Sequence, residues 1–335
     1  MSRETGYSAA GMAAERSMRW LKKTGYAALA VLAIAAIAVA AALIAYRDIP
    51  TDRLESKYTS PASRFIHIDG VRIHYRDEGA GPAVLLLHGN FSNLLGWDPW
   101  VAALKDKYRV VRFDITAFGL TGADPSGNYS DERTLALTEK LVDAVGLKRF
   151  AIGGTSLGGN IAIRYAVKHP GRIDKLILLN PAMLTSRALD RSGERIPDAA
   201  EVLRYITPRS LASYLLRSRA GDPAKITEEH VDRWYDMWMR EGNRAAMLRR
   251  LRVYRGSDPA NLLGQVKVPV LIMWGAANPE APVAQAEELK RMLANAPDVR
   301  LITYPGVGRP ALEEAGDITA RDARAWLDGT LDPKR

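Results

Sequence analysis

The sequence lacks cysteine entirely and contains only five histidines, and both facts restrict its chemistry. Without cysteine the chain can form no disulfide, thiol nucleophile, iron–sulfur cluster or Cys-ligated zinc site. The histidines are His67, His74, His88, His169 and His230. So few imidazoles leave little choice for a metal site or a general base. We expect no metal and no cofactor.

The sequence also lacks a long run of charges of one sign. The formal net charge of +9 comes from 47 Lys plus Arg against 38 Asp plus Glu. The densest basic cluster has helical spacing and consists of Arg244, Arg249, Arg250, Arg252 and Arg255. Such a cluster is usually a solvated helix face, so we expect it to be exposed and predict no nucleic-acid partner. With 47% hydrophobic and 25% charged residues, most of the 335-residue chain is expected to be globular.

One long apolar stretch separates Lys23 from Arg47. These 23 uncharged residues would span about 35 Å as a helix, enough to cross a bilayer. We predict a transmembrane helix over 24–46 in contact with the lipid bilayer, after a basic cytoplasmic tail (1–23) and before a stalk (47–63). A cleaved signal peptide is the alternative, because residues 38–40 (Ala-Val-Ala) fit a cleavage site.

The flanking charges predict the orientation of this span. Four basic residues lie within the eight before it and two within the eight after it. That asymmetry predicts a single-pass protein of the inner (cytoplasmic) membrane, with the body on the periplasmic side. Because Ala inserts weakly into lipid, a membrane-protein partner packing against the helix is a further expectation.

The body shows the pattern of an α/β protein. Alternating segments at 64–68 and 71–75 predict a hairpin, and short apolar runs separated by helix-length stretches predict buried parallel strands. Those runs lie at 83–87, 110–113, 150–152, 176–179, 268–274 and 299–304. No strand-like run occurs between Asn180 and Val268. We therefore predict a core over 64–180 and 263–335, interrupted by a helical cap over 181–262.

One motif carries chemistry. Residues 150–159 (Phe-Ala-Ile-Gly-Gly-Thr-Ser-Leu-Gly-Gly) form an apolar strand that runs through G-x-S-x-G into a helix at 160–168. In that context the motif is a nucleophile elbow. Together with His88-Gly89 after one strand and Asp114 to Gly122 after the next, it resembles the α/β-hydrolase fold family. The resemblance covers roughly 64–330 and is strongest to bacterial membrane-anchored hydrolases akin to C–C bond hydrolases and esterases.

The resemblance implies roles for a few residues. Ser156 matches the nucleophile, and the backbone amides of Asn90 and Leu157 match the oxyanion hole. His88 matches a position that is structural in this family. The helical insertion matches the cap that closes the pocket. His67 and His74, on the hairpin, are expected to be surface or sheet-face residues.

The chain departs from the family pattern at the acid and the base. The acid position, in Trp274-Gly275-Ala276-Ala277-Asn278, is Asn278, and the base position after the last strand is Arg309. Asp114 and Glu280 lie near strand ends and are candidate acids, but neither supplies a base. Helical rise puts His169 about 20 Å from Ser156. His230, in the cap, is a remote candidate.

These departures predict weak or absent catalysis. Arg has no acceptor and does not deprotonate, so Arg309 cannot take the Ser156 proton. We expect a membrane-anchored ligand- or partner-binding module; the alternative is an active serine hydrolase on an ester or related acyl substrate with an unconventional base. Asn278 and Arg309 also make the pocket more positive, so Arg309 should pair either with an acidic residue or with an anionic ligand. The acidic candidates are Glu280, Glu313 and Glu314.

Overall fold

The computed structural model describes residues 9–182, 198–253 and 260–332. The chain divides into two compact units, Met1–Arg47 and Asp48–Arg335, which are described separately.

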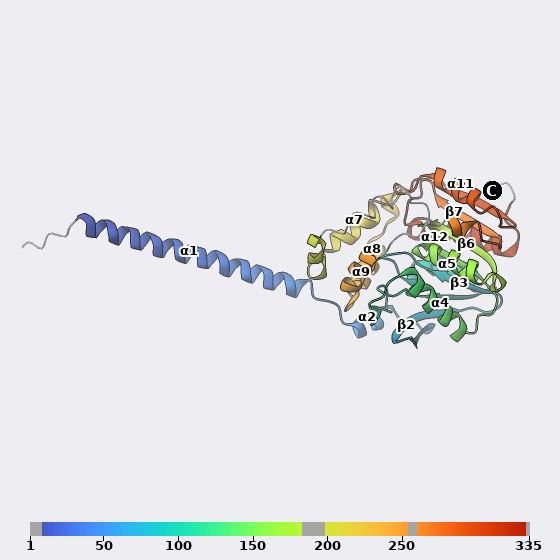
Figure 1. The fold of residues 1–335 in the computed structure, drawn as a ribbon, viewed down its shortest axis with the longest axis horizontal. Coiled ribbons are helices and arrows are strands. Elements are labelled where there is room, and N and C mark those ends of the chain that lie inside the picture. The colour runs from blue at the N-terminus through green and yellow to red at the C-terminus, as the bar shows by residue number, and fades with distance from the viewer. Residues whose placement is uncertain (1–8, 183–197, 254–259, 333–335) are drawn as a thin grey trace, which may run out of the picture. The chain divides into compact units, whose positions relative to one another are not determined.

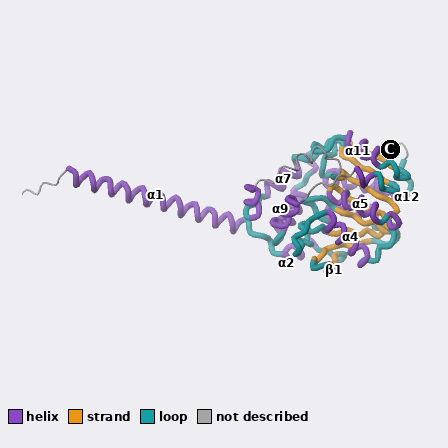
Figure 2. The backbone as a smooth tube through the Cα atoms, viewed as in Figure 1, coloured by secondary structure: helices purple, strands orange, loops and turns teal. Residues whose placement is uncertain are grey.

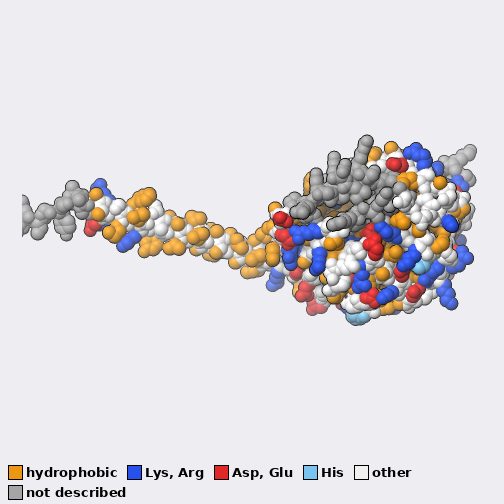
Figure 3. Space-filling model, viewed as in Figure 1, with side chains coloured by type: hydrophobic (Ala, Val, Ile, Leu, Met, Phe, Trp, Pro, Cys, Tyr) orange, Lys and Arg blue, Asp and Glu red, His pale blue; other side chains and the backbone are white. Residues whose placement is uncertain are grey.

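The first unit is one long helix, α1 (Ala9–Ala45). Its segment Met12–Ala45 has a mean hydropathy of 2.8 in its most apolar window and no buried residue there. Figure 3 shows hydrophobic side chains along the helix and charged ones near its N-terminal end. It is long and apolar enough to cross a membrane, a test that a signal sequence also passes. The helix begins earlier than predicted, so residues 9–23 are helical, which suits a segment rich in Ala, Met, Arg and Lys.

The second unit begins at Asp48, which makes the predicted stalk wrong beyond Arg47. Helix α2 (Thr51–Tyr58) buries Leu54, which is only 1% exposed. Asp48 pairs with Arg244 at 2.7 Å, and Tyr58 donates to Asp236 at 2.7 Å. The segment is largely polar, but its one leucine is buried, and residues far along the chain bind the segment to the body.

An eight-stranded sheet forms the centre of the body, in the order β1-β2-β4-β3-β5-β6-β7-β8. The strands from β3 onward are mutually parallel, while β2 is antiparallel to both of its neighbours, β1 and β4. Their bounds are β1 (Ser63–Ile68), β2 (Val71–Glu78), β3 (Ala83–Leu87), β4 (Arg109–Phe113), β5 (Phe150–Ser156), β6 (Ile173–Pro181), β7 (Val270–Gly275) and β8 (Val299–Tyr304). Every strand predicted from the sequence is present, with ends shifted by a few residues.

Helices cover both faces of the sheet (Figure 2). Alternate residues of each parallel strand enter two different apolar clusters: Leu85 and Leu87 of β3 lie in one, and Val84 and Leu86 in the other. The first cluster includes α4 (Asp131–Ala144), α5 (Leu157–Lys168) and α11 (Val283–Met292), and the second includes α3 (Asp98–Leu104) and α12 (Ala311–Asp328). Burial on both faces explains why these strands are continuous apolar runs.

The insertion after β6 supplies the cap. Its described helices are η3 (Asp198–Arg204), α7 (Arg209–Arg217), η4 (Pro223–Lys225), α8 (Glu228–Met239), α9 (Asn243–Val253) and α10 (Ala260–Leu263). Helices α7, α8 and α9 group together beside the sheet (Figure 1). Trp238 of α8 donates to the Phe91 carbonyl at 2.9 Å, which ties the cap to the loop after β3.

The basic cluster on α9 is exposed only in part: Arg249 and Arg252 are exposed as predicted, but two other arginines are buried. Arg250 is fully buried, and its guanidinium donates to the Thr134 hydroxyl of α4 at 3.0 Å. Arg244 is also buried, against Asp48. Arg255 lies outside the described residues. The prediction failed for these two arginines because Arg can bury its alkyl stem and bond its guanidinium to the core, which residue type alone does not reveal.

Candidate active site

Ser156 occupies a strained turn between β5 and α5. Its backbone has φ +50° and ψ −117°, a region that non-glycine residues rarely adopt. A Cβ at Gly158 would lie 2.2 Å from the Leu87 carbonyl oxygen, so only glycine lets the helix approach β3 this closely. The sequence motif therefore forms the nucleophile elbow that it predicts.

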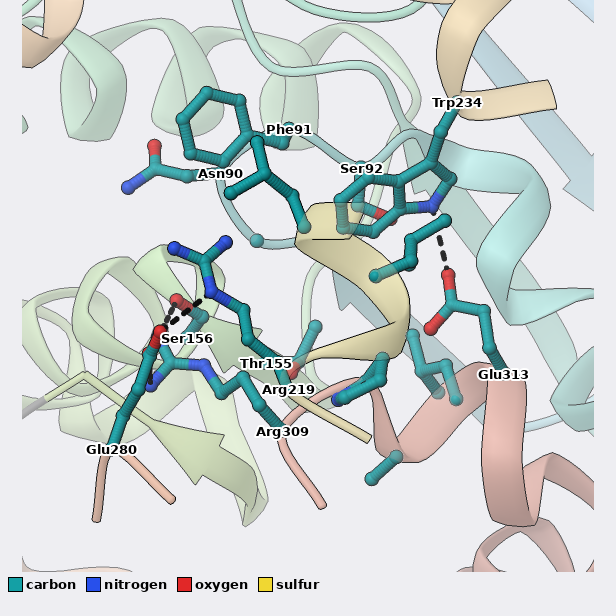
Figure 4. A pocket seen from close by; sticks show the side chains of 16 residues that line it. Asn90, Phe91, Ser92, Thr155, Ser156, Arg219, Trp234, Glu280, Arg309 and Glu313 are labelled. Atoms are coloured by element: carbon teal, nitrogen blue, oxygen red, sulfur yellow. Dashed lines mark hydrogen bonds and ion pairs between the residues drawn. The ribbon is translucent and has the colours of Figure 1, made fainter. Parts of the chain in front are cut away.

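Arg309 points at Ser156. Its Nη2 donates a hydrogen bond to the serine Oγ at 2.8 Å, and its Nη1 lies 3.1 Å from Glu280 Oε2. Figure 4 shows the guanidinium beside both the serine and the carboxylate. A general base for Ser156 would have to occupy the position that the Arg309 N–H donor fills. Arg309 thus takes the acidic partner that the sequence offered as one alternative, and it also faces the serine; the anionic ligand stays a prediction.

Asn278, at the acid position, is 5% exposed. Its Oδ1 accepts a hydrogen bond from the Glu280 backbone N–H at 3.0 Å, while its Nδ2 is buried without a partner. A buried polar atom without a partner costs free energy. The Asn278 side chain therefore stabilises the turn that leads to Glu280, and its Nδ2 has no partner among the described residues. In a catalytic triad, an acid at this position would instead accept a hydrogen bond from the histidine.

Glu280 is shared by two arginines. Besides Arg309 it pairs with Arg219, whose Nε lies 2.6 Å from Glu280 Oε1. Arg219 belongs to the cap, just after α7, whereas Glu280 follows β7. Of the three acidic residues proposed from the sequence as partners of Arg309, Glu280 is the one with which the structure pairs it.

The other two acidic candidates bind elsewhere. Glu314 accepts from the backbone N–H of Gly308 at 2.8 Å and of Asp222 at 2.9 Å, which joins the loop before α12 to the cap. Glu313 accepts from the Trp234 indole N–H at 3.0 Å, and its side chain is 4% exposed. Burial raises the pKa of the Glu313 carboxyl, while Arg233 at 3.7 Å and the indole bond act to lower it.

None of the five histidines lines the cavity beside Ser156. His88 is buried, with Nδ1 against the Gly89 carbonyl (2.7 Å) and Nε2 accepting from the Ile115 N–H (2.9 Å). Burial lowers its pKa, so it is a neutral structural residue, as the resemblance implies. His169 pairs with Glu139 at 2.7 Å, and His230 Nδ1 accepts from the Thr227 N–H at the start of α8.

His74 is the histidine whose surroundings the sequence did not reveal. It is buried on the sheet face, and its Nδ1 lies 2.8 Å from Asp114 Oδ2. Asp114 also accepts from the Leu94 and Leu120 backbone N–H groups, both at 2.8 Å. Burial acts to raise the pKa of Asp114, but His74 and the Leu94 N–H help to lower it overall. Asp114 therefore fixes loops and does not replace the acid at Ser156. His67 is exposed on β1.

A cavity of about 140 Å³ adjoins Ser156. Asn90 lies in its wall, while Leu157 directly follows Ser156 at the start of α5 with its side chain buried. Apolar side chains from core and cap make up much of the remaining wall: Phe91, Leu215, Leu216, Trp234 and Leu312. The described residues contain no group of three or more His, Asp or Glu side chains suited to a metal ion.

Three site residues escaped the sequence analysis. Arg219 and Trp234 come from the cap, where no motif marks the residues that point inward. Asn180, at the end of β6, donates to the carbonyls of Gly308 (2.9 Å) and Arg309 (3.2 Å) and accepts from the Gly275 N–H. The available signal in the sequence was its position at a strand end. Its φ of +42° is one that Asn adopts more readily than most residues.

Comparisons with known proteins agree with this architecture. A sequence profile described as the alpha/beta hydrolase fold matches residues 82–315. The 2-hydroxy-6-oxo-6-phenylhexa-2,4-dienoate hydrolase of Burkholderia cepacia is 27% identical over 283 residues, covering 78% of this chain and 95% of that enzyme. The 2-hydroxy-6-oxononadienedioate/2-hydroxy-6-oxononatrienedioate hydrolase 1 of Dechloromonas aromatica is 29% identical over 274 residues, covering 76% and 91%.

A crystal structure of a membrane phospholipase A, described as a bacterial virulence factor, superposes with a TM-score of 0.67 and 23% identity. The alignment covers 92% of this chain and 99% of that one, and the likeness concerns the fold. The profile match extends over more than two thirds of the chain and includes the elbow. The protein therefore belongs to the α/β-hydrolase fold family.

Proposed function

We propose that the body is a non-hydrolytic member of its family that holds a small ligand or a partner group in the cavity beneath the cap. The hydrogen bond from Arg309 to Ser156 carries this proposal. Serine needs an adjacent base to become a nucleophile, and an arginine offers five N–H donors and no acceptor. The group beside Ser156 is thus one that cannot take its proton.

The surrounding residues support the same conclusion. Glu280 lies in the same cavity wall, but its two carboxylate oxygens already pair with two guanidinium groups. Loss of the histidine alone in a serine protease costs on the order of a million-fold in turnover. Conventional ester hydrolysis by this site should therefore be weak and should depend little on Ser156.

The retained elbow favours a second candidate, an active serine hydrolase on an acyl substrate. A non-glycine residue at φ +50° costs about 1–3 kcal/mol, a strain that nucleophile elbows share. The described part of the structure offers no histidine to complete such an enzyme. Its relatives include hydrolases by their names, so the distinction needs a direct measurement.

Labelling with a serine-directed fluorophosphonate probe makes that measurement. The purified full-length protein should show no labelling that depends on Ser156, so the wild type and Ser156→Ala should give equal signals. A family hydrolase with an intact triad serves as the positive control under the same conditions. Stoichiometric labelling that disappears in Ser156→Ala would establish the active-hydrolase alternative instead.

We further propose that α1 anchors the body to the inner membrane, with the body on the periplasmic side. The apolar segment Met12–Ala45 and the excess of basic residues before the span support this. The full-length protein should stay in the membrane pellet after alkaline carbonate washing, and protease added to spheroplasts should digest the body. A mature N-terminus near residue 41 would show instead that the segment is a cleaved signal peptide.

The Ala-rich surface of α1 is also suited to packing against a membrane-protein partner. Crosslinking in intact membranes, with a probe placed on successive α1 positions, should give adducts with helical periodicity. Uniform crosslinking to lipid alone would contradict the partner.

A further inference from the structure

Strand β8 ends the sheet and has an unpaired edge. It is last in the strand order, and within the described chain β7 is the one strand that pairs with it. The Val270 N–H donates to the Asp298 carbonyl at 2.8 Å, and the Ala276 N–H donates to the Tyr304 carbonyl at 2.9 Å. Because backbone groups alternate in direction along a strand, the even-numbered residues of β8 face β7. The N–H and C=O groups that point away from the sheet are therefore those of Val299, Leu301 and Thr303.

This edge lacks the usual protection against pairing. Natural edge strands are blocked by a proline, a bulge or an inward-pointing charge. Strand β8 contains no proline, its pairing with β7 shows no register shift, and its one charged residue, Arg300, pairs with Asp298 at 3.0 Å. A groove of about 450 Å³ lies beside the edge and is lined by residues of β8 and α12. Its wall includes Thr303, which is exposed, and Ile318, which is 41% exposed, so the edge is accessible and has an apolar side chain next to it.

We propose that β8 pairs with β8 of a second copy of this chain, antiparallel about a two-fold axis at Leu301, so that two bodies share one continuous sheet. In this register Val299 of each copy lies opposite Thr303 of the other, and every outward-facing residue of both strands is paired. A shift by two residues in either direction leaves one of them unpaired, and one of these shifts places Arg300 opposite Arg300 of the other copy. Like charges directly opposite are destabilising, which favours the symmetric register. The inference concerns association of the body and is independent of the reactivity of Ser156.

Charges at the two ends of the groove identify the second copy as the occupant. Lys225 is exposed and lines the groove, and it ends η4. Gly221, just before η4, abuts the chain after β8, because a Cβ on it would lie 2.4 Å from the Gly306 carbonyl oxygen. Asp298 lies at the other end of β8, and its side chain is 42% exposed. Residues 298 and 304 are about 20 Å apart along the strand. Antiparallel pairing brings Asp298 of each copy to the end where Lys225 of the other copy lies, so the surface is complementary to itself.

Single cysteines test the register, because the chain has no cysteine of its own. In the proposed pair, the two residues at position 301 are hydrogen-bonded to each other with Cα atoms about 5.5 Å apart, which a disulfide can bridge. The two residues at position 303 are about 14 Å apart, which it cannot. Oxidation of the full-length protein in detergent should therefore give a disulfide-linked dimer from Leu301→Cys and none from Thr303→Cys, the matched control. No dimer from folded Leu301→Cys, or equal yields from the two variants, would overturn the proposal.

A mixture of two variants replaces Leu301→Cys if that variant does not fold. Val299→Cys and Thr303→Cys chains, mixed before oxidation, should form a mixed disulfide, because these residues lie opposite each other across the two-fold axis. Each variant oxidised alone should remain monomeric under denaturing electrophoresis. A mixture that gives no mixed disulfide, although both proteins are folded, would contradict the proposed pairing.

A charge exchange tests whether the occupant is a second copy. Lys225→Glu and Asp298→Lys, each added to the cysteine variant, should lower the disulfide yield by about three- to ten-fold, since two exposed ion pairs become like-charge pairs. The two changes combined should restore the yield. Within one chain the two residues are too far apart for such a rescue. Lys148→Glu, the same change at an exposed lysine outside the groove, is the matched control and should have no effect. A folded double variant without rescue would refute the second copy as the occupant.

Discussion

On the proposed non-hydrolytic function, restoring an acid and a base should make Ser156 reactive. The perturbation is the double variant Asn278→Asp with Arg309→His. The orphan Nδ2 of Asn278 marks the buried position at which a carboxylate oxygen could accept a histidine N–H. A positioned general base typically contributes about 10²- to 10⁴-fold to a rate, which sets the expected gain in ester hydrolysis.

The local backbone should tolerate this change, because the backbone groups of Arg309 make hydrogen bonds that do not depend on the side chain at this position. The Arg309 N–H donates to the Arg219 carbonyl at 2.8 Å, and the Arg309 carbonyl accepts from Asn180 at 3.2 Å. Glu280 keeps Arg219 as a partner when Arg309 is removed, so no carboxylate is orphaned. The lost ion pair is partly exposed, and we expect the free energy of unfolding to fall by only about 1 kcal/mol.

The assay is hydrolysis of short p-nitrophenyl esters by four proteins: the wild type, the double variant, and each of these with Ser156→Ala. The wild type should match its Ser156→Ala partner within a few-fold, while the double variant should be about 10²- to 10⁴-fold faster and lose that gain with Ser156→Ala. Arg309→Gln, which removes the charge without adding a base, is the matched control and should give no gain. A wild-type rate that drops a hundred-fold in Ser156→Ala, or a folded double variant no faster than the wild type, would refute the reasoning.

Three further changes test the packing around the site. Burial raises the pKa of Glu313 above its ordinary value, so its contribution to stability is complete below pH of about 4.5 and is lost as pH rises through the raised pKa. Glu313→Gln keeps an acceptor for Trp234 and should therefore raise the unfolding midpoint at pH 8.5 but not at pH 4.5; an equal effect at both values would contradict the shift. Leu54→Ala should lower the free energy of unfolding in urea by about 2–5 kcal/mol, whereas a solvated stalk predicts no change. Gly89→Ala puts a Cβ 2.8 Å from the Ser156 Cβ and should cost about 1–3 kcal/mol in the same assay, so an unchanged midpoint would show that the loop moves freely.

Much of the fold could be predicted because its signals are local. Residues 83–87 and 299–304 are short apolar runs bounded by loops, and they coincide with β3 and β8. The elbow could be predicted for the same reason, since Ser156 lies between glycines whose lack of Cβ permits the turn. The family resemblance assigned Asn278 and Arg309 to places after the last two strands, and the structure brings Arg309 to Ser156 and Asn278 to the turn before Glu280.

Residues whose setting depends on distant partners could not be predicted. Arg250 has the sequence context of a surface helix, yet its buried guanidinium donates to the Thr134 hydroxyl of α4. Leu54 lies in a segment of charges and hydroxyls, and only its docking on the body shows that it is buried. The same limit applies to Arg219 and Trp234, because an amphipathic cap helix does not reveal which side chains reach the cavity.

The sequence by itself determined the absence of thiol chemistry, the position of Ser156 and, through the family resemblance, the presence of Arg309 at the base position, because each depends on residue identity at a place that a local pattern defines. It could not determine where the Arg309 side chain points. Tertiary structure decided that, since Glu280 after β7, Arg219 from the cap and Ser156 after β5 are far apart in the chain and meet only when the sheet is assembled. A guanidinium on a flexible stem takes its direction from such partners, and here they turn it onto the serine.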